Sequence, residues 1–442
     1  MLTRISVLLL FPVLLIACSE NQMQEETMAA QEPAPVQVDL TNQVIPAAGF
    51  VINNARILDG NGGVIENGSI VVQGNRIVAV NQGSSSVDGA LVIDAQGRSV
   101  MPGFIDAHRH IITGEDPAAW LADDAEAAMQ AFLEAGFTTL LSAGDAPQQI
   151  LELRRMTAEN ELAGPRIIAA SFTGLAAGGG GGGPEGDPAR FDVARPPMRP
   201  TEAAAALPEE AVRGQIQRLY DNGFDAAKNV IIVTPGGPEE EALGMIVEET
   251  NRLGIRTITH AVTVTDTLAA VRAGVDQLVH TPHIEMLTEE QAQFIADSGI
   301  PMTSTLGIFV PFFDDNNEPI FRDYLPFPWD TILSAGQGPV NARLLWEAGV
   351  VYGFGTDTRY EPELTLNHEL KSLYLVFSEE DILQIMGRNA AVNIAMEDEL
   401  GTLEAGKLAD IVLVDGNPQE DIFDLLNVDV VIKDGVFVVD KR

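Results

Sequence analysis

Cysteine and positive charge are both scarce in this chain of 442 residues. It has one Cys, and its 26 Lys and Arg stand against 64 Asp and Glu, which gives a formal net charge of −38. A single cysteine excludes an intramolecular disulfide. So acidic a chain has no affinity for nucleic acids or anionic lipid surfaces, because both would be repelled. We expect a solvated acidic surface and a small-molecule substrate that is neutral or cationic.

Long apolar runs are also lacking, except near the N-terminus. Ile5 to Ile16 follows a short basic end and is too short for a membrane span, which is typical of a signal peptide. Leu15 to Cys18 resembles the lipobox of bacterial lipoproteins. We predict a lipoprotein signal peptide over 1–18 with Cys18 lipidated; the alternative is a cleaved secretory peptide with an incidental cysteine. Residues 19–47, rich in Glu, Gln, Pro and Ala, would then be a flexible tether.

This leader predicts an exported protein in the periplasm whose only membrane contact is the N-terminal lipid. Ser19, the residue after the cysteine, favours the outer membrane if the host is Gram-negative. The sequence is compatible with a homo-oligomer as well as with a monomer.

The rest of the chain has two β-rich ends and a different middle. Short strands separated by Gly, Asn and Asp turns occupy 48–100 and 395–442, whereas 101–394 repeats an apolar strand followed by a helix. That repeat indicates parallel β/α units. The predicted fold class is therefore α/β, a (β/α)8 TIM barrel with a small β-sandwich domain formed by both chain ends.

Two histidines stand two positions apart in Met-Pro-Gly-Phe-Ile-Asp-Ala-His-Arg-His, residues 101–110. Because side chains alternate along a strand, His108 and His110 point the same way. Two neutral imidazoles directed into one cavity suit a divalent ion such as zinc. The alternative is that the two histidines form a chance pair. Further polar residues at the ends of later strands would argue against chance.

Four further polar residues, Lys228, His260, His280 and Asp357, stand in or at the ends of apolar strand-like runs. In a barrel, the carboxyl ends of the strands meet at one rim. One helix separates His260 from His280, so these two should end neighbouring strands. Lys228 is one of five lysines; its alternative interpretation is a lysine at a strand edge that reaches solvent.

These motifs together resemble the amidohydrolase superfamily, in particular its branch near imidazolonepropionases and Xaa-Pro-type dipeptidases. The likeness runs from about residue 50 to the C-terminus. Besides the residues above, it is carried by Gly-Thr-Asp at 355–357, Arg-Asn-Ala-Ala at 388–391 and Gly-Thr-Leu-Glu-Ala-Gly-Lys-Leu-Ala-Asp-Ile at 401–411.

The resemblance implies a binuclear site with two divalent ions, expected to be zinc. His108, His110 and Asp357 would ligate the first ion, His260 and His280 the second, and carbamylated Lys228 would bridge them. A free ammonium would be repelled there, whereas a carbamate is anionic.

The implied function is hydrolysis of an amide bond in a small peptide-like or N-acyl amino acid substrate by metal-activated hydroxide, with Asp357 as the catalytic base. A mononuclear deaminase or cyclic-amide (imidazolonepropionase-like) hydrolase is one alternative, although it leaves Lys228 without a task. A non-catalytic binding lipoprotein is another, although no expected ligand position is substituted.

Substrate contacts are the least defined part of the site. His283 could contact substrate at the pocket mouth or be an exposed loop histidine. The aromatic stretch 309–329 could wall an apolar pocket or cap the barrel. Six glycines at 178–183 favour a flexible loop. Val262 stands where many related dipeptidases have a second histidine after the strand.

Overall fold

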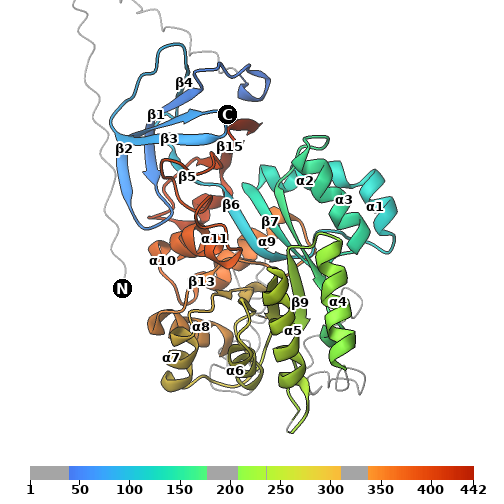
Figure 1. Cartoon of the computed structure of the whole chain (residues 1–442). Coiled ribbons are helices and arrows are strands. Elements are labelled where there is room, and N and C mark those ends of the chain that lie inside the picture. Colours follow the sequence, from blue (N-terminus) through green and yellow to red (C-terminus); the bar gives the residue numbers. More distant parts are fainter. Residues whose placement is uncertain (1–38, 177–207, 235, 310–336) are drawn as a thin grey trace, which may run out of the picture. The chain divides into compact units, whose positions relative to one another are not determined.

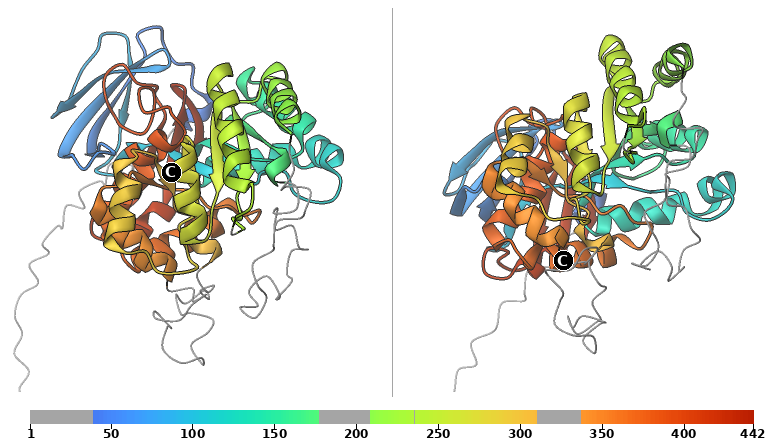
Figure 2. Two further views of the ribbon diagram at one scale, coloured as in Figure 1. Left: turned by 60° about the horizontal axis from the view of Figure 1, so that its bottom comes forward. Right: turned by 90° about the horizontal axis from the view of Figure 1, so that it is seen from below.

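The computed structural model describes residues 39–176, 208–234, 236–309 and 337–442. Two β-sheets organise this part of the chain, and each has eight strands. Helices pack around one of the sheets, as Figures 1 and 2 show. No helix in the described ranges is long and apolar enough to cross a membrane.

The first sheet is a parallel barrel whose strands follow one another in chain order. Its strands are β6 (Phe104–Arg109), β7 (Phe137–Ala143), β8 (Arg166–Phe172), β9 (Ala226–Val230), β10 (Arg256–His260), β11 (Gln277–Val279), β12 (Met302–Thr303) and β13 (Tyr352–Gly353). The last strand returns to the first, because the Ala107 N–H donates to the Phe354 carbonyl at 3.1 Å. The predicted TIM barrel is confirmed.

Helices alternate with these strands and pack their apolar faces on the barrel. They are α1 (Pro117–Asp123), α2 (Ala125–Glu134), α3 (Pro147–Ala158), α4 (Glu209–Asp221), α5 (Glu239–Leu253), α6 (Val264–Ala273), α7 (Glu289–Asp297), α8 (Gln337–Ala348), α9 (Pro362–Tyr374), α10 (Glu379–Gln384) and α11 (Ala390–Asn393). Their ends follow local sequence. Thr263 caps α6, a Thr288–Gln291 capping box begins α7, and Gly254 ends α5 in the left-handed conformation.

The second sheet joins both ends of the described chain. Its strands are β1 (Phe50–Leu58), β2 (Val64–Gln73), β3 (Arg76–Gln82), β4 (Leu91–Asp94), β5 (Ser99–Pro102), β14 (Ile411–Val414), β15 (Val428–Lys433) and β16 (Val436–Asp440). The antiparallel pairing of β5 with β14 connects the two ends, whose blue and red strands lie together in Figure 1. The predicted β domain from both ends is therefore present, and its eight strands bond as one sheet around their own apolar core.

Asp410, the residue before β14, connects this sheet to the barrel. Its carboxylate accepts from Arg166 Nη1 at 2.8 Å and from the Asp434 N–H at 2.8 Å. Arg166 begins β8, and its Nη2 also donates to Asp434. The junction therefore lies at the amino ends of the barrel strands, the face at which TIM barrels concentrate residues for stability rather than chemistry.

We predict that Asp410→Ala lowers the free energy of unfolding by about 2 kcal/mol, because the half-buried Arg166 guanidinium loses one of its three side-chain acceptors and the Asp434 N–H loses its carboxylate acceptor. Urea unfolding followed by circular dichroism measures this loss. Asp415→Ala is the control, since Asp415 is exposed and lies at the other end of β14. Its free energy of unfolding should stay within about 0.5 kcal/mol of wild type. Equal losses for both variants would contradict the prediction.

Candidate metal centre

The six predicted ligands all lie in barrel strands or in the short segments that follow them. His108 is in β6 with His110 just beyond it, Lys228 is in β9, and His260 ends β10. His280 and Asp357 follow β11 and β13. Because all these strands are parallel, their carboxyl ends face one rim, and the side chains meet there.

The closest group consists of His108, His110 and Asp357, whose ligand atoms lie within 4.8 Å of one another. Asp357 Oδ1 is 3.3 Å from His108 Nε2 and 3.2 Å from His110 Nε2. Two imidazole nitrogens and a carboxylate oxygen converging in this way could hold a divalent metal ion.

The other three predicted ligands adjoin this group. Lys228 Nζ lies 3.2 Å from His108 Nε2, and His280 Nε2 lies 3.7 Å from the second oxygen of Asp357. The His260 and His280 rings are next to each other, with centroids 4.3 Å apart. The structure thus brings all six side chains into one cluster.

Buried atoms without partners test whether a cation fits this cluster. His280 is 1% exposed, and its Nε2 has no hydrogen-bond partner among the described residues. Its other nitrogen, Nδ1, lies 2.7 Å from Thr305 Oγ1. A buried ring nitrogen left open beside a carboxylate, with its opposite nitrogen held by a hydroxyl, is the arrangement expected of a metal-binding histidine. The donor set fits a divalent ion.

The protonation states also suit a cation. Burial, assisted by nearby Lys228, lowers the pKa of His108 and of His260 to about 3. Burial would raise the pKa of Asp357, but His280 and hydrogen bonds from His108 and His110 outweigh it and hold that pKa well below its usual range. Neutral imidazoles and an ionised carboxylate are the forms in which these side chains bind metals.

Lys228 is buried as its strand position predicts. It is 2% exposed, and burial lowers its pKa from 10.5 to about 7. Its low exposure excludes a solvent-reaching lysine at a strand edge, and its pKa leaves a large fraction of the amine neutral near pH 7.

Two positioning carboxylates were not predicted. Asp106 is fully buried and accepts from the His108 N–H and the Thr356 N–H, each at 3.1 Å. Asp145 accepts from the N–H groups of Ile111 and Ile112 and so holds the chain that follows His110. Asp106 belongs to the His-x-His motif, whereas nothing in the sequence around Asp145 indicates its role.

His283 is half-buried, and its ring stacks on Phe309 with centroids 3.7 Å apart. Burial lowers its pKa to about 4. It is therefore not the freely exposed loop histidine that was one interpretation of the sequence. Phe309 also meets His280 edge to face, with ring centroids 5.4 Å apart. Cys18, residues 178–183 and residues 310–329 of the aromatic stretch lie outside the described residues.

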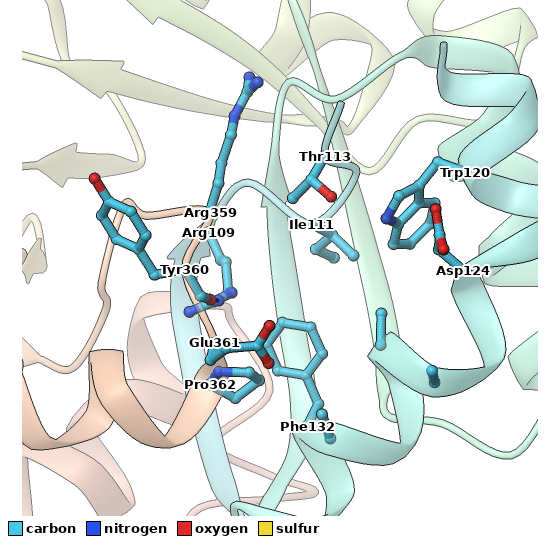
Figure 3. Close-up of a pocket in the computed structure, with 13 residues that line it drawn as sticks. Arg109, Ile111, Thr113, Trp120, Asp124, Phe132, Arg359, Tyr360, Glu361 and Pro362 are labelled. Carbon is cyan, nitrogen blue, oxygen red and sulfur yellow. Dashed lines mark hydrogen bonds between the residues drawn. The ribbon is translucent and has the colours of Figure 1, made fainter. Parts of the chain in front are cut away.

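A separate cavity of about 310 Å³ lies beside Arg109, Trp120, Phe132 and Tyr360 (Figure 3). Arg109 alternates with His108 and His110 along β6, so it points to the other face of that strand. Its guanidinium donates to Thr356 and Thr365 and lies 4.6 Å from the Phe132 ring centroid. None of the six predicted ligands, all of which are described, lines this cavity.

Comparison with known proteins identifies the class. Residues 99–438 match the Amidohydrolase family, and the chain belongs to it. It is a metal-dependent hydrolase that acts on carbon–nitrogen bonds.

Individual relatives differ in their named activities. An imidazolonepropionase from Caldanaerobacter subterraneus subsp. tengcongensis is 24% identical over 79% of this chain and 84% of its own length. A 5-methylthioadenosine/S-adenosylhomocysteine deaminase from Bacillus cereus is 24% identical over 80% and 81%. A crystal structure of a Xaa-Pro dipeptidase with bound methionine in the active site has a TM-score of 0.68 and 25% identity, and covers 88% of this chain and 99% of that one.

The lowered pKa of Lys228 gives a stability prediction for metal-free protein in buffer depleted of carbon dioxide. Between pH 7 and 10.5 the unfolded chain keeps the Lys228 proton and the folded chain has lost it, so stability rises with pH through this window. The difference in unfolding free energy between wild type and Lys228→Met should grow in favour of wild type from pH 7 to about 10. Lys441→Met, at an exposed lysine, is the control. Parallel curves of unfolding free energy against pH for Lys228→Met and wild type would contradict the lowered pKa of Lys228.

Proposed function

We propose that this chain is a binuclear metallohydrolase that cleaves the amide bond of a small peptide-like or N-acyl amino acid substrate. The observation that carries the proposal is the buried Lys228 amine, 3.2 Å from His108 Nε2, in one cluster with Asp357 and the His260–His280 pair. A site for one ion would need no buried lysine at that place. The fold likeness to a Xaa-Pro dipeptidase supports the same substrate class.

His108, His110 and Asp357 would hold one ion, and His260 with His280 would hold the other. Zinc suits this set of imidazoles and carboxylates. When bound, the two ions would supply Lewis acidity toward the substrate carbonyl and toward water. The carbamate of Lys228 would link them as an anionic two-oxygen ligand.

The lysine can form that carbamate because much of it is unprotonated near neutral pH. Its neutral Nζ adds to carbon dioxide, a nitrogen–carbon bond forms, and one proton leaves to solvent. The product carries one negative charge where the ammonium carried one positive charge, so the site gains affinity for cations. Burial favours the neutral amine with which this reaction starts, since the free ammonium is poorly solvated there.

Asp357 is placed to move the proton that hydrolysis requires. Its backbone N–H donates to the His108 carbonyl at 2.7 Å, which fixes the carboxylate between His110 and His280. In the proposed reaction one Asp357 oxygen accepts a proton from the attacking water. The same oxygen then returns it to the departing nitrogen, so the carboxylate ends the cycle ionised.

His283 and Phe309 support an apolar neighbour to the scissile amide. The His283 ring stacks on Phe309, whose ring meets His280 edge to face, and His283 is neutral at physiological pH. A neutral imidazole can bond a substrate amide without binding anions strongly. Together with the net charge of −38, this favours an apolar or aromatic acyl group over a polyanion.

A substrate panel on zinc-loaded protein tests the proposal. We expect kcat/KM to be highest for Xaa-Pro dipeptides or N-acyl amino acids with an apolar or aromatic acyl side, above lactones and phosphotriesters. Asp357→Asn keeps the size of the side chain but is a poor proton acceptor, so turnover should fall about 100-fold or more with the fold intact. A lactone or phosphotriester that exceeds every amide would contradict the substrate class.

Metal content separates this proposal from a mononuclear alternative. Two ions per chain, measured by elemental analysis of protein purified with bicarbonate, fit the binuclear site. One ion per chain, together with turnover of a cyclic amide or deamination of a purine nucleoside, would instead favour the activities named for the bacterial relatives.

We further propose export and N-terminal lipid anchoring, on the sequence Leu-Ile-Ala-Cys at 15–18. Cys18→Ser should abolish labelling by radioactive palmitate and move the protein from the membrane fraction to the soluble fraction. Ser19→Ala is the matched control and should still be labelled. Labelled Cys18→Ser protein would show that the lipobox interpretation is wrong.

A further inference from the structure

Glu369 is a buried carboxylate on α9 that the proposed chemistry does not use. It is 1% exposed. Its Oε1 accepts from Ser304 Oγ at 2.5 Å and from the Leu306 N–H at 2.9 Å, and its Oε2 accepts from the Gly307 N–H at 2.6 Å. All three donors come from one short segment, 304–307, which follows β12. One side chain therefore holds this whole segment against α9.

The held segment presents Thr305 to the metal centre. Thr305 Oγ1 lies 2.7 Å from His280 Nδ1. Thr305 has φ +46°, in the left-handed region that a β-branched residue rarely adopts. Such a conformation persists only where its surroundings hold it. Glu369 bonds the residues on both sides of Thr305, and the Thr305 N–H donates to the Gly355 carbonyl at 3.1 Å.

The segment also fits closely around the carboxylate. A Cβ added to Gly307 would lie 2.9 Å from Glu369 Oε2, which is too near for an ordinary contact. Only glycine therefore fits at position 307, and the 304–307 segment cannot move away from α9 without leaving the buried Glu369 carboxylate short of donors.

The Thr305 hydroxyl orients the His280 ring, and as a donor or an acceptor it can bond either tautomer. If Nδ1–H donates to Thr305 Oγ1, the lone pair on Nε2 is free, and Nε2 is the atom that lies 3.7 Å from Asp357 and has no partner among the described residues. That tautomer and ring orientation are the ones needed to bind a cation through Nε2.

We propose that Glu369 is a positioning residue which, through the 304–307 segment, sets the Thr305–His280 hydrogen bond and thereby the metal affinity of the His260–His280 half of the site. This inference rests on the proposed function only in treating His280 as a ligand. In this role Glu369 touches neither the substrate nor a metal ion.

Zinc binding to metal-free protein tests this without any turnover measurement. Glu369→Gln keeps the shape but replaces one accepting oxygen by an NH2 group, so at least one of the three donors loses its acceptor. The His260–His280 half has one side-chain ligand fewer than the His108–His110–Asp357 half, so we expect it to bind the weaker zinc ion. By competition with a coloured chelator, affinity for this ion should fall about 10-fold, with the tighter ion unchanged. Glu363→Gln, an exposed change on the same helix, is the control and should match wild type.

A double-mutant cycle separates positioning from general stability. Thr305→Val keeps the β-branched shape and removes the hydroxyl. Added to Thr305→Val, the Glu369→Gln change should weaken zinc by no more than about 2-fold further, because both act through one hydrogen bond. The proposal would be overturned if the loss of zinc affinity in the double variant equalled the product of the two single losses. It would also be overturned if Glu369→Gln were less stable but bound zinc like wild type.

Two further variants keep the test decisive. If Glu369→Gln does not fold, Ser304→Ala removes one of its three donors, and it should weaken the same zinc ion by a smaller factor; unchanged affinity would overturn the proposal. His280→Ala should abolish the weaker zinc site. If wild type binds only one zinc ion, the proposed binuclear function fails; if both zinc ions still bind to His280→Ala, His280 is not a ligand and the Glu369 inference fails. If His280→Ala loses one ion while the Glu369 and Ser304 variants bind like wild type, only the Glu369 inference fails.

Discussion

Closure of the barrel between its first and last strands is the constraint on which the site depends. The Asp357 N–H donates to the His108 carbonyl at 2.7 Å, which brings a predicted ligand in the first barrel strand into contact with one that follows the last strand. The buried Asp106 carboxylate strengthens this closure by accepting from both His108, in β6, and Thr356, which follows β13. Because these bonds are short and inaccessible to water, the relative position of His108 and Asp357 is set by the fold before any ion binds.

The opposite face of β6 supports the same closure. Arg109 alternates with the histidines and donates to Thr356 and Thr365, so it holds the chain after β13 from outside the barrel. A fully buried guanidinium is costly to desolvate unless its donors are used. Here the cost is offset by hydroxyl acceptors, by the nearby Asp106 carboxylate at 3.8 Å and by the face of Phe132. Strand β6 thus directs the imidazoles of His108 and His110 to the metal centre and the guanidinium of Arg109 away from it.

The alternation of strand side chains made much of this arrangement predictable from the sequence. It placed His108 and His110 on one face, and the strand–helix repeat gave the barrel in which Lys228, His260, His280 and Asp357 reach a common rim. Residues such as Thr305, Glu369 and Asp145 could not be found in this way. Ser304 and Glu369 are 65 positions apart, and periodicity within an element does not say which loop packs on which helix. Their residue types are also common on any surface.

The backbone conformation at the rim could not be predicted from the sequence either. It explains why the site needs these supporting residues. His280, Thr305 and Asp357 have φ values of +75°, +46° and +50°, although none is glycine. Each such residue costs on the order of 1–3 kcal/mol unless surrounding bonds hold it. The His108 carbonyl holds Asp357, and the Gly355 carbonyl and Glu369 hold Thr305 and its neighbours. The strain lies where the ligands converge, so the buried acceptors around the rim are a requirement of the site rather than an accident of packing.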